Sequence, residues 1–139
     1  MRTRNPIRCA TALFVVVLAS SAVNGEAPPR KLVEVWNGSP HDVYTSGLRD
    51  SLEQRFQVSS DFQLSTGKRS NTIVVTIPGA VKWKKDGNNT LITYLVTFSD
   101  EVGTDLGNAS GSCWASDYGD CAGQILTKAL MISPARPPR

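Results

Sequence analysis

Thr72-Ile73-Val74-Val75-Thr76-Ile77 decides the fold of this chain, because β-branched residues occupy nearly every position of the segment. Such side chains fit a pleated, half-buried surface, so the segment predicts a strand. Pro78-Gly79 predicts a kink or bulge, after which the strand continues from 80 to 84 as far as a turn at 85–89. The chain returns over 91–98 with alternating side chains. Together these segments predict a long antiparallel hairpin.

Two amphipathic helices are expected on either side of this hairpin in the sequence. The first covers about 42–57, with Ser39 as its hydroxyl cap, Pro40 as its first helical residue and Asp42 near the positive end of its dipole. The second covers about 117–132 and has candidate caps at Ser116 and Asp117. Apolar residues recur at helical spacing in both, at Tyr44, Leu48, Leu52 and Phe56, and at Tyr118, Cys121, Ile125, Ala129 and Ile132.

Further strands are expected at 31–36 and, as a short one, at 62–65. Residues 102–106 form either another strand or an extension of the hairpin, and 107–112 is a loop by composition. The order β-α-β-β-β-α predicts an α+β fold with two layers. In this fold two helices pack on one face of a mostly antiparallel sheet.

Residues 1–25 have the order of a secretory signal peptide: three arginines, an apolar run from Ala10 to Ala19, and then small residues. The run is too short to cross a bilayer, so we expect no stable membrane insertion after cleavage. Residues 26–132 are then one domain and 133–139 a disordered, proline-rich tail. The chain has 15 Lys and Arg and 12 Asp and Glu, and Arg2, Arg4 and Arg8 leave with the leader, so the exported part is neutral. A neutral domain disfavours nucleic-acid binding.

Cys113 and Cys121 are the two cysteines that remain after cleavage. An even number in an oxidising compartment predicts a disulfide. A structural zinc site usually takes four Cys or His ligands, and the exported part offers these two cysteines and His41. We therefore expect no metal, and no sequence motif indicates a cofactor.

The helix-to-strand passage resembles a known group of small envelope modules. The pattern Gly47-Leu48-x-x-x-Leu52-x-x-x-Phe56-x-x-Ser59-x-x-Phe62-x-Leu64 is similar to that of the amino-terminal domain of the Tol-system periplasmic protein and of the lipoprotein activators of penicillin-binding proteins. The resemblance covers residues 47–64. It implies an α/β module without catalytic residues that works through protein contacts, and it favours the periplasm over the extracellular space. The disulfide is not part of that pattern.

Catalytic chemistry finds little support in the sequence. His41 is the one histidine, and no Gly-x-Ser-x-Gly elbow accompanies it. Asp100 and Glu101 are adjacent at a strand end and point apart, and Asp117 and Asp120 fit the amino terminus of the second helix. We expect no enzyme activity.

Lys82-Trp83-Lys84-Lys85 is the local charge cluster of the chain and supplies the candidate partner-binding residues. Either Trp83 packs inward and the lysines protect a strand edge, or the segment is a docking tip for an acidic partner, an anionic envelope polymer or a glycan stacked on the indole. The sequence favours an exported, non-enzymatic adaptor or accessory factor. Its partner is an envelope or secreted protein, bound through the hairpin or a sheet edge. The alternative is an inhibitor or immunity-type protein that blocks a secreted enzyme with the 86–90 loop.

Overall fold

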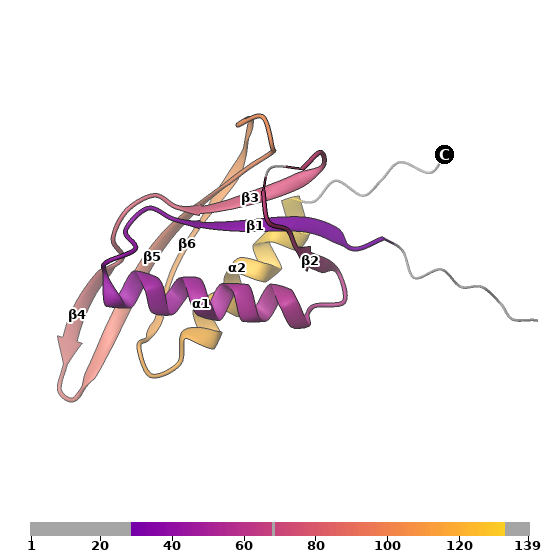
Figure 1. Ribbon diagram of the computed structural model, residues 1–139. Coiled ribbons are helices and arrows are strands. Elements are labelled where there is room, and N and C mark those ends of the chain that lie inside the picture. Colours follow the sequence, from indigo (N-terminus) through magenta and orange to yellow (C-terminus); the bar gives the residue numbers. More distant parts are fainter. Residues whose placement is uncertain (1–28, 68, 133–139) are drawn as a thin grey trace, which may run out of the picture.

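The computed structural model of the protein describes residues 29–67 and 69–132. The predicted leader and tail lie outside these residues. The described part contains six strands and two helices. In chain order they are β1 (Lys31–Asn37), α1 (Val43–Val58), β2 (Phe62–Leu64), β3 (Thr72–Ile77), β4 (Lys82–Asp86), β5 (Asn89–Ser99), β6 (Asp105–Trp114) and α2 (Tyr118–Ile132) (Figure 1).

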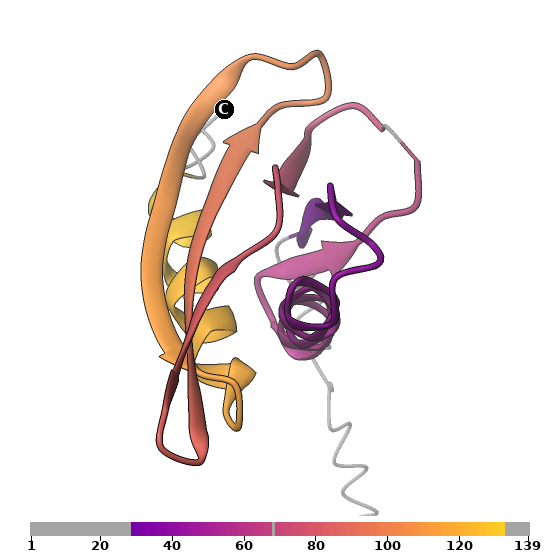
Figure 2. The ribbon, with the colours of Figure 1, turned by 90° about the vertical axis from the view of Figure 1, so that its left-hand side faces the viewer.

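All six strands belong to one sheet, and the two helices lie on the same face of this sheet (Figure 2). β1 runs parallel to both β2 and β3, whereas β5 pairs antiparallel with β3, β4 and β6. β6 follows nearly the whole length of β5, so β3 and β4 share the other side of β5. β3 pairs with 97–99 and β4 with 89–93. The predicted α+β fold, with two helices on a mostly antiparallel sheet, is confirmed.

The core lies between the sheet and the helices. Alternate residues of β3 and β5 point into it, as the pleat requires, and residues four apart on α1 meet them. Gly47 lets the helices approach, because a Cβ atom built there would lie 2.6 Å from the ring of Tyr118. The largest side chains that are less than 2 % exposed are Phe56, Phe62, Phe98, Leu48, Leu52, Ile73, Ile77, Ile92, Ile125, Val33, Val75 and Val96.

The amino-terminal cap of α1 differs from the prediction. Asp42, and not Ser39, is the N-cap, because its carboxylate accepts the N–H of Thr45 at 2.8 Å. Pro40 and His41 form a turn before the helix and are not its first residues. The Asp42 carboxylate accepts both the N–H and the hydroxyl group of Thr45, so it satisfies a free N–H of the first turn.

The prediction of a loop at 107–112 is wrong, because these residues are the middle of β6. The small size of Gly111 on the helical face is explained by contacts with its neighbours. A Cβ atom at Gly111 would lie 2.5 Å from Gln124 Oε1 of α2 and 2.8 Å from the hydroxyl group of Tyr94 on β5. The composition therefore reflects close approach of a helix and not a turn.

Candidate functional site

The segment 82–85 lies on an arm, defined here as β4 together with residues 89–93 of β5. The arm extends beyond the helices at one end of the molecule (Figure 1). All five residues of β4 are exposed. The alternation of the strand separates the predicted binding residues, because Trp83 is in register with the buried Ile92, whereas Lys82 and Lys84 point to the opposite face.

Trp83 is partly covered by α1. Its ring centroid lies 5.4 Å from that of Tyr44, at an interplanar angle of 44°, and 52 % of the residue remains exposed. The tryptophan thus packs toward the helical layer while keeping one side open. Lys85 follows on the same face of the strand.

Thr45 fixes the base of the arm. It is fully buried, and its Oγ1 accepts the N–H of Val81 at 3.0 Å and donates to the carboxylate of Asp42. These hydrogen bonds, first the hydroxyl and then the backbone N–H of Thr45, lower the pKa of Asp42 from its ordinary value of 3.8. One side chain therefore connects the helix cap to the segment between β3 and β4.

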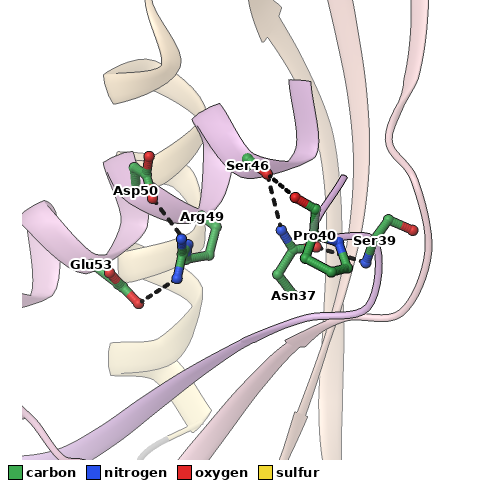
Figure 3. Close-up of polar contacts among 7 residues, drawn as sticks. All are labelled: Asn37, Ser39, Pro40, Ser46, Arg49, Asp50 and Glu53. Atoms are coloured by element: carbon green, nitrogen blue, oxygen red, sulfur yellow. Dashed lines mark hydrogen bonds and ion pairs between the residues drawn. The ribbon is translucent and has the colours of Figure 1, made fainter. Parts of the chain in front are cut away.

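The connection from β1 to α1 is held by a second set of polar contacts (Figure 3). Asn37 Oδ1 accepts the N–H of Ser39 at 2.8 Å, and the hydroxyl group of Ser46 donates to the carbonyl of Pro40 at 3.0 Å. The N–H of Gly38 donates to Ile77 O at 2.8 Å, which joins this connection to the end of β3. Further along α1, Arg49 Nε lies 3.0 Å from a carboxylate oxygen of Asp50, and Arg49 Nη1 lies 3.5 Å from Glu53, both partly exposed pairs.

The outer edge of β6 has no pairing partner among the described strands. The strand is ten residues long, and only Asp105 at its start is charged. Natural proteins usually protect such an edge with lysine, proline or a bulge in its middle. The one irregularity of the β5–β6 pairing lies at Phe98/Ser99, close to the β5–β6 turn. Residues 106–114 thus form an uncharged edge.

The sheet face away from the helices carries exposed apolar side chains. Trp36 is 49 % exposed, Leu95 51 % and Trp114 40 %. Trp114 is in register with Leu91 of β5, which is in register with Lys84 of β4, so the three form one row across the arm and β6. The sequence analysis missed Trp114 as a surface residue of a strand because it ended the sheet before β6.

A hollow of about 200 Å³ lies at the other end of this open face, beneath the β5–β6 turn. Trp36 forms one wall, and Val74, which is 8 % exposed and stands outside the main core, belongs to its lining. Asp100 and Glu101 contribute carboxylates. Desolvation raises the pKa of Asp100, but hydrogen bonds from the turn, chiefly from Thr104, outweigh this and lower it overall. The group is therefore ionised at neutral pH.

The remaining candidates for chemistry are placed apart. His41 is exposed in the turn before α1, and Asp120 lies in the first turn of α2. Within 29–67 and 69–132, no three His, Cys, Asp or Glu side chains gather where they could hold a metal ion. No helix of the described residues is long and apolar enough to cross a membrane. Cys113 and Cys121 are joined by a disulfide, with 5.5 Å between their Cα atoms, and this bond ties β6 to α2.

No protein-family model matches this sequence, and no curated protein matches it either. Several solved structures are similar to this chain in fold. They include a minor lipoprotein from Acinetobacter baumannii, with 15 % identity, a TM-score of 0.47 and coverage of 71 % of this chain and 91 % of that one. The PelC dodecamer from Paraburkholderia phytofirmans has 16 % identity, a TM-score of 0.48 and coverage of 78 % and 90 %. The hypothetical protein CT253 from Chlamydia trachomatis has 9 % identity, a TM-score of 0.38 and coverage of 75 % and 94 %. At these values the likeness concerns the fold alone.

Proposed function

We propose that this chain is a small exported protein without enzyme activity that binds another protein of the cell envelope. The contact is a strand of the partner added to the outer edge of β6. The observation that carries the proposal is the long, uncharged edge of residues 106–114, which no other described strand pairs with, although the carbonyl of Ser112 accepts a hydrogen bond from Gln124 of α2 at 3.3 Å. Strand addition needs only unpaired backbone groups and therefore needs no catalytic side chains. The disulfide supports export, because such bonds persist in oxidising compartments.

The described sheet has three free edges, of which that of β2 is only three residues long, and the other two, on β4 and β6, differ in a way that selects β6. On β4 the three lysines hinder pairing with another chain, which is a usual protection of an edge. β6 has no such protection between Leu106 and Trp114. We therefore assign strand addition to β6, and assign Lys82, Lys84 and Lys85 the role of keeping the arm unpaired and attracting an acidic part of the partner.

The side chains beside the edge specify the kind of segment that would bind. On the open face an added strand meets Trp114 at one end and the hydroxyl groups of Ser110 and Ser112 further along. On the helical face it lies near α2, which exposes Leu130 and Met131. An extended segment with alternating apolar residues, at least one of them opposite Trp114, fits both faces.

An inhibitor would use a different part of the molecule. Asp86 and Asn89 are in register, so Gly87 and Asn88 form a tight two-residue turn and not an extended loop. Insertion into an enzyme would require the whole arm, with its exposed lysines. Partner capture that depends on the arm and not on β6 would therefore favour the inhibitor.

The test compares two substitutions in one row of the open face. Ser112 and Thr93 are in register and both exposed, but Ser112 lies on the edge strand and Thr93 on the central strand β5. A photo-crosslinking residue at Ser110 identifies the partner in the native host, and the affinity of the purified pair is then measured. We expect Ser112→Glu to weaken binding at least about tenfold, the equivalent of about 1.4 kcal/mol, and Thr93→Glu to change it little.

Two results would contradict the proposal. If Thr93→Glu weakens binding as much as Ser112→Glu, the partner covers the face or the arm and not the edge. If neither variant affects binding, the partner does not use this part of the sheet. Trp83→Ala with the same partner reports separately on the arm.

A further inference from the structure

The end of the open face that belongs to the arm combines an exposed indole with two lysines. Lys84 of β4, Leu91 of β5 and Trp114 of β6 are in register and form one row. Lys82 and Thr93 belong to the next row, two residues along the strands. These five residues are called the lysine–tryptophan patch. Alternate residues of a strand point to the same side of a sheet, so their side chains share the face away from the helices.

The patch is accessible, and its charges are not neutralised within the described part of the chain. Four of its residues are exposed, Leu91 is half-buried, and Trp114 is 40 % exposed. The ion pairs among the described residues lie within α1, so neither lysine has an acidic partner there. Two strand spacings, about 9.6 Å, separate the backbones of Lys84 and Trp114. A small ring placed on the indole is therefore within reach of an ammonium group on its flexible four-carbon stem.

The charges of the open face are divided between its two ends. Asp100 and Glu101 line the hollow at the far end, and Glu34 is in register with Val74 of that hollow. At the arm end, Asp86 beside the turn is the one acid of β4, which carries three lysines. An anionic ligand is therefore attracted to the patch and repelled from the other end of the face.

The shape of the patch favours a ligand that stacks on a flat surface. β5 is paired on both sides at these positions, so its backbone groups are already used, and none of the five residues lines the hollow. A protein partner anchors itself with side chains in well-packed pockets. A sugar ring instead presents a flat side of C–H groups to an indole, and its hydroxyl groups pair with a hydroxyl such as that of Thr93. A carboxylate on such a ring pairs with lysine ammonium groups.

We propose that the lysine–tryptophan patch binds an acidic glycan. A uronic acid ring stacks on the indole of Trp114 with its carboxylate at Lys84, and Lys82 contacts the neighbouring sugar. This inference goes beyond the proposed function, because it uses the face of the sheet and no backbone group at the outer edge of β6.

The test measures binding of defined oligosaccharides to the purified protein with its disulfide intact. Tetramers of galacturonic, glucuronic and mannuronic acid are added while the indole N–H resonances are followed by ¹⁵N-correlation NMR. At least one tetramer should shift the resonance of Trp114 and leave those of Trp36 and Trp83 in place. Binding should weaken between ionic strengths of about 0.01 M and 1 M, because the Debye length falls from about 30 Å to about 3 Å. The methyl ester of the bound tetramer keeps the rings without the charges and should bind at least about tenfold more weakly.

Pairs of matched variants separate the two faces of the arm. Lys84→Gln should weaken binding of the tetramer at least about threefold, whereas Lys85→Gln, on the opposite face of the same strand, should change it little. Trp114→Ala should weaken binding further, and Trp83→Ala should not. Thr93→Glu adds a like charge to the patch and should weaken glycan binding, although the same variant is expected to leave strand addition at β6 unchanged.

The outcomes that would overturn the proposal are distinct from those that test the β6 edge. Absence of binding by all three acidic tetramers, equal binding of a tetramer and its methyl ester, or equal effects of Lys84→Gln and Lys85→Gln would each overturn it. Tighter binding of tetraglutamate than of any tetramer would assign the patch to an acidic peptide and would overturn it as well. Crosslinking at Ser110 tests the proposed function alone, so the two proposals fail separately.

Discussion

Two buried threonines of this protein should respond with opposite sign to the same substitution. Thr45 is 0 % exposed and its hydroxyl oxygen accepts the N–H of Val81, whereas Thr72 is 1 % exposed and its hydroxyl group has no hydrogen-bond partner in the described part. Replacement by valine keeps the shape of the side chain and exchanges a hydroxyl group for a methyl group. The free energy of unfolding should therefore fall for Thr45→Val and rise for Thr72→Val.

The magnitudes follow from the hydrogen bonds. Thr45→Val leaves the buried N–H of Val81 without an acceptor, at a cost of about 1–3 kcal/mol, and Asp42 loses a donor that water can replace. Thr72→Val removes a buried hydroxyl group that is already unpaired and adds apolar contact, a gain of about 1 kcal/mol. For a domain of this size, 1 kcal/mol shifts the melting temperature by roughly 4 °C.

Urea unfolding followed by circular dichroism measures both values, and an unchanged dependence on urea shows that the unfolded state is not altered. Hydrogen exchange of the Val81 amide adds a local measurement, because exchange should accelerate in Thr45→Val more than in Thr72→Val. The argument fails if Thr45→Val is as stable as the unchanged protein. It also fails if both variants change stability in the same direction.

The remaining predictions concern backbone contact, the disulfide and acid. Gly38→Ala should lower the free energy of unfolding by about 1–3 kcal/mol, because a Cβ atom there meets backbone oxygens at 2.8 and 2.9 Å. Gly79→Ala should be neutral or stabilising, because a Cβ atom there has nothing within 4 Å. Thermal melting of both variants measures the difference. Replacement of Cys113 and Cys121 by alanine should cost about 2–3 kcal/mol, as expected for a short loop, and equal stability with and without a reductant in the unchanged protein would contradict this. Folding lowers the pKa of Asp42, so this carboxylate stabilises the folded protein above pH 3.8, and the stabilisation is lost as the pH falls toward the lower pKa of the folded state. Urea titrations at several pH values should show that Asp42→Asn reduces the loss of stability in this pH range.

Most of the fold was predictable because periodicity reports directly on burial. In α1 the residues four apart, Leu48, Leu52 and Phe56, are the ones that the structure buries, and the alternation of β5 places Ile92 and Tyr94 inside. These patterns depend on one face of each element meeting the core. The helix α1 begins and ends one residue later than predicted, because its cap is the residue whose side chain reaches Thr45.

The strand that carries the candidate site was hidden for a physical reason. Gly111 is a glycine because the hydroxyl group of Tyr94 and the amide of Gln124 meet over it at 2.9 Å. Burial, with a smaller contribution from Asp120, raises the pKa of Tyr94 and keeps this hydroxyl group protonated as a donor. Composition alone does not distinguish small residues required by such a contact from small residues of a turn. The alternation of the polar residues Asn108, Ser110 and Ser112 with small residues between them was the available signal.

The same constraint that made β6 unrecognisable also limits the side chains of its inner face. A strand whose inner face must stay small to admit α2 cannot carry long lysine side chains on that face, and its exposed positions hold serine and asparagine instead of charge. On β4, Lys85 lies on the helical face, whereas Lys82 and Lys84 lie on the open face. Close packing of α2 therefore accounts for the absence of long side chains on the inner face of β6, whereas the uncharged residues Asn108, Ser110 and Ser112 on the open face are a separate property of the sequence. A substitution that fills the space at Gly111 should disturb partner binding through the helix before it changes the edge itself.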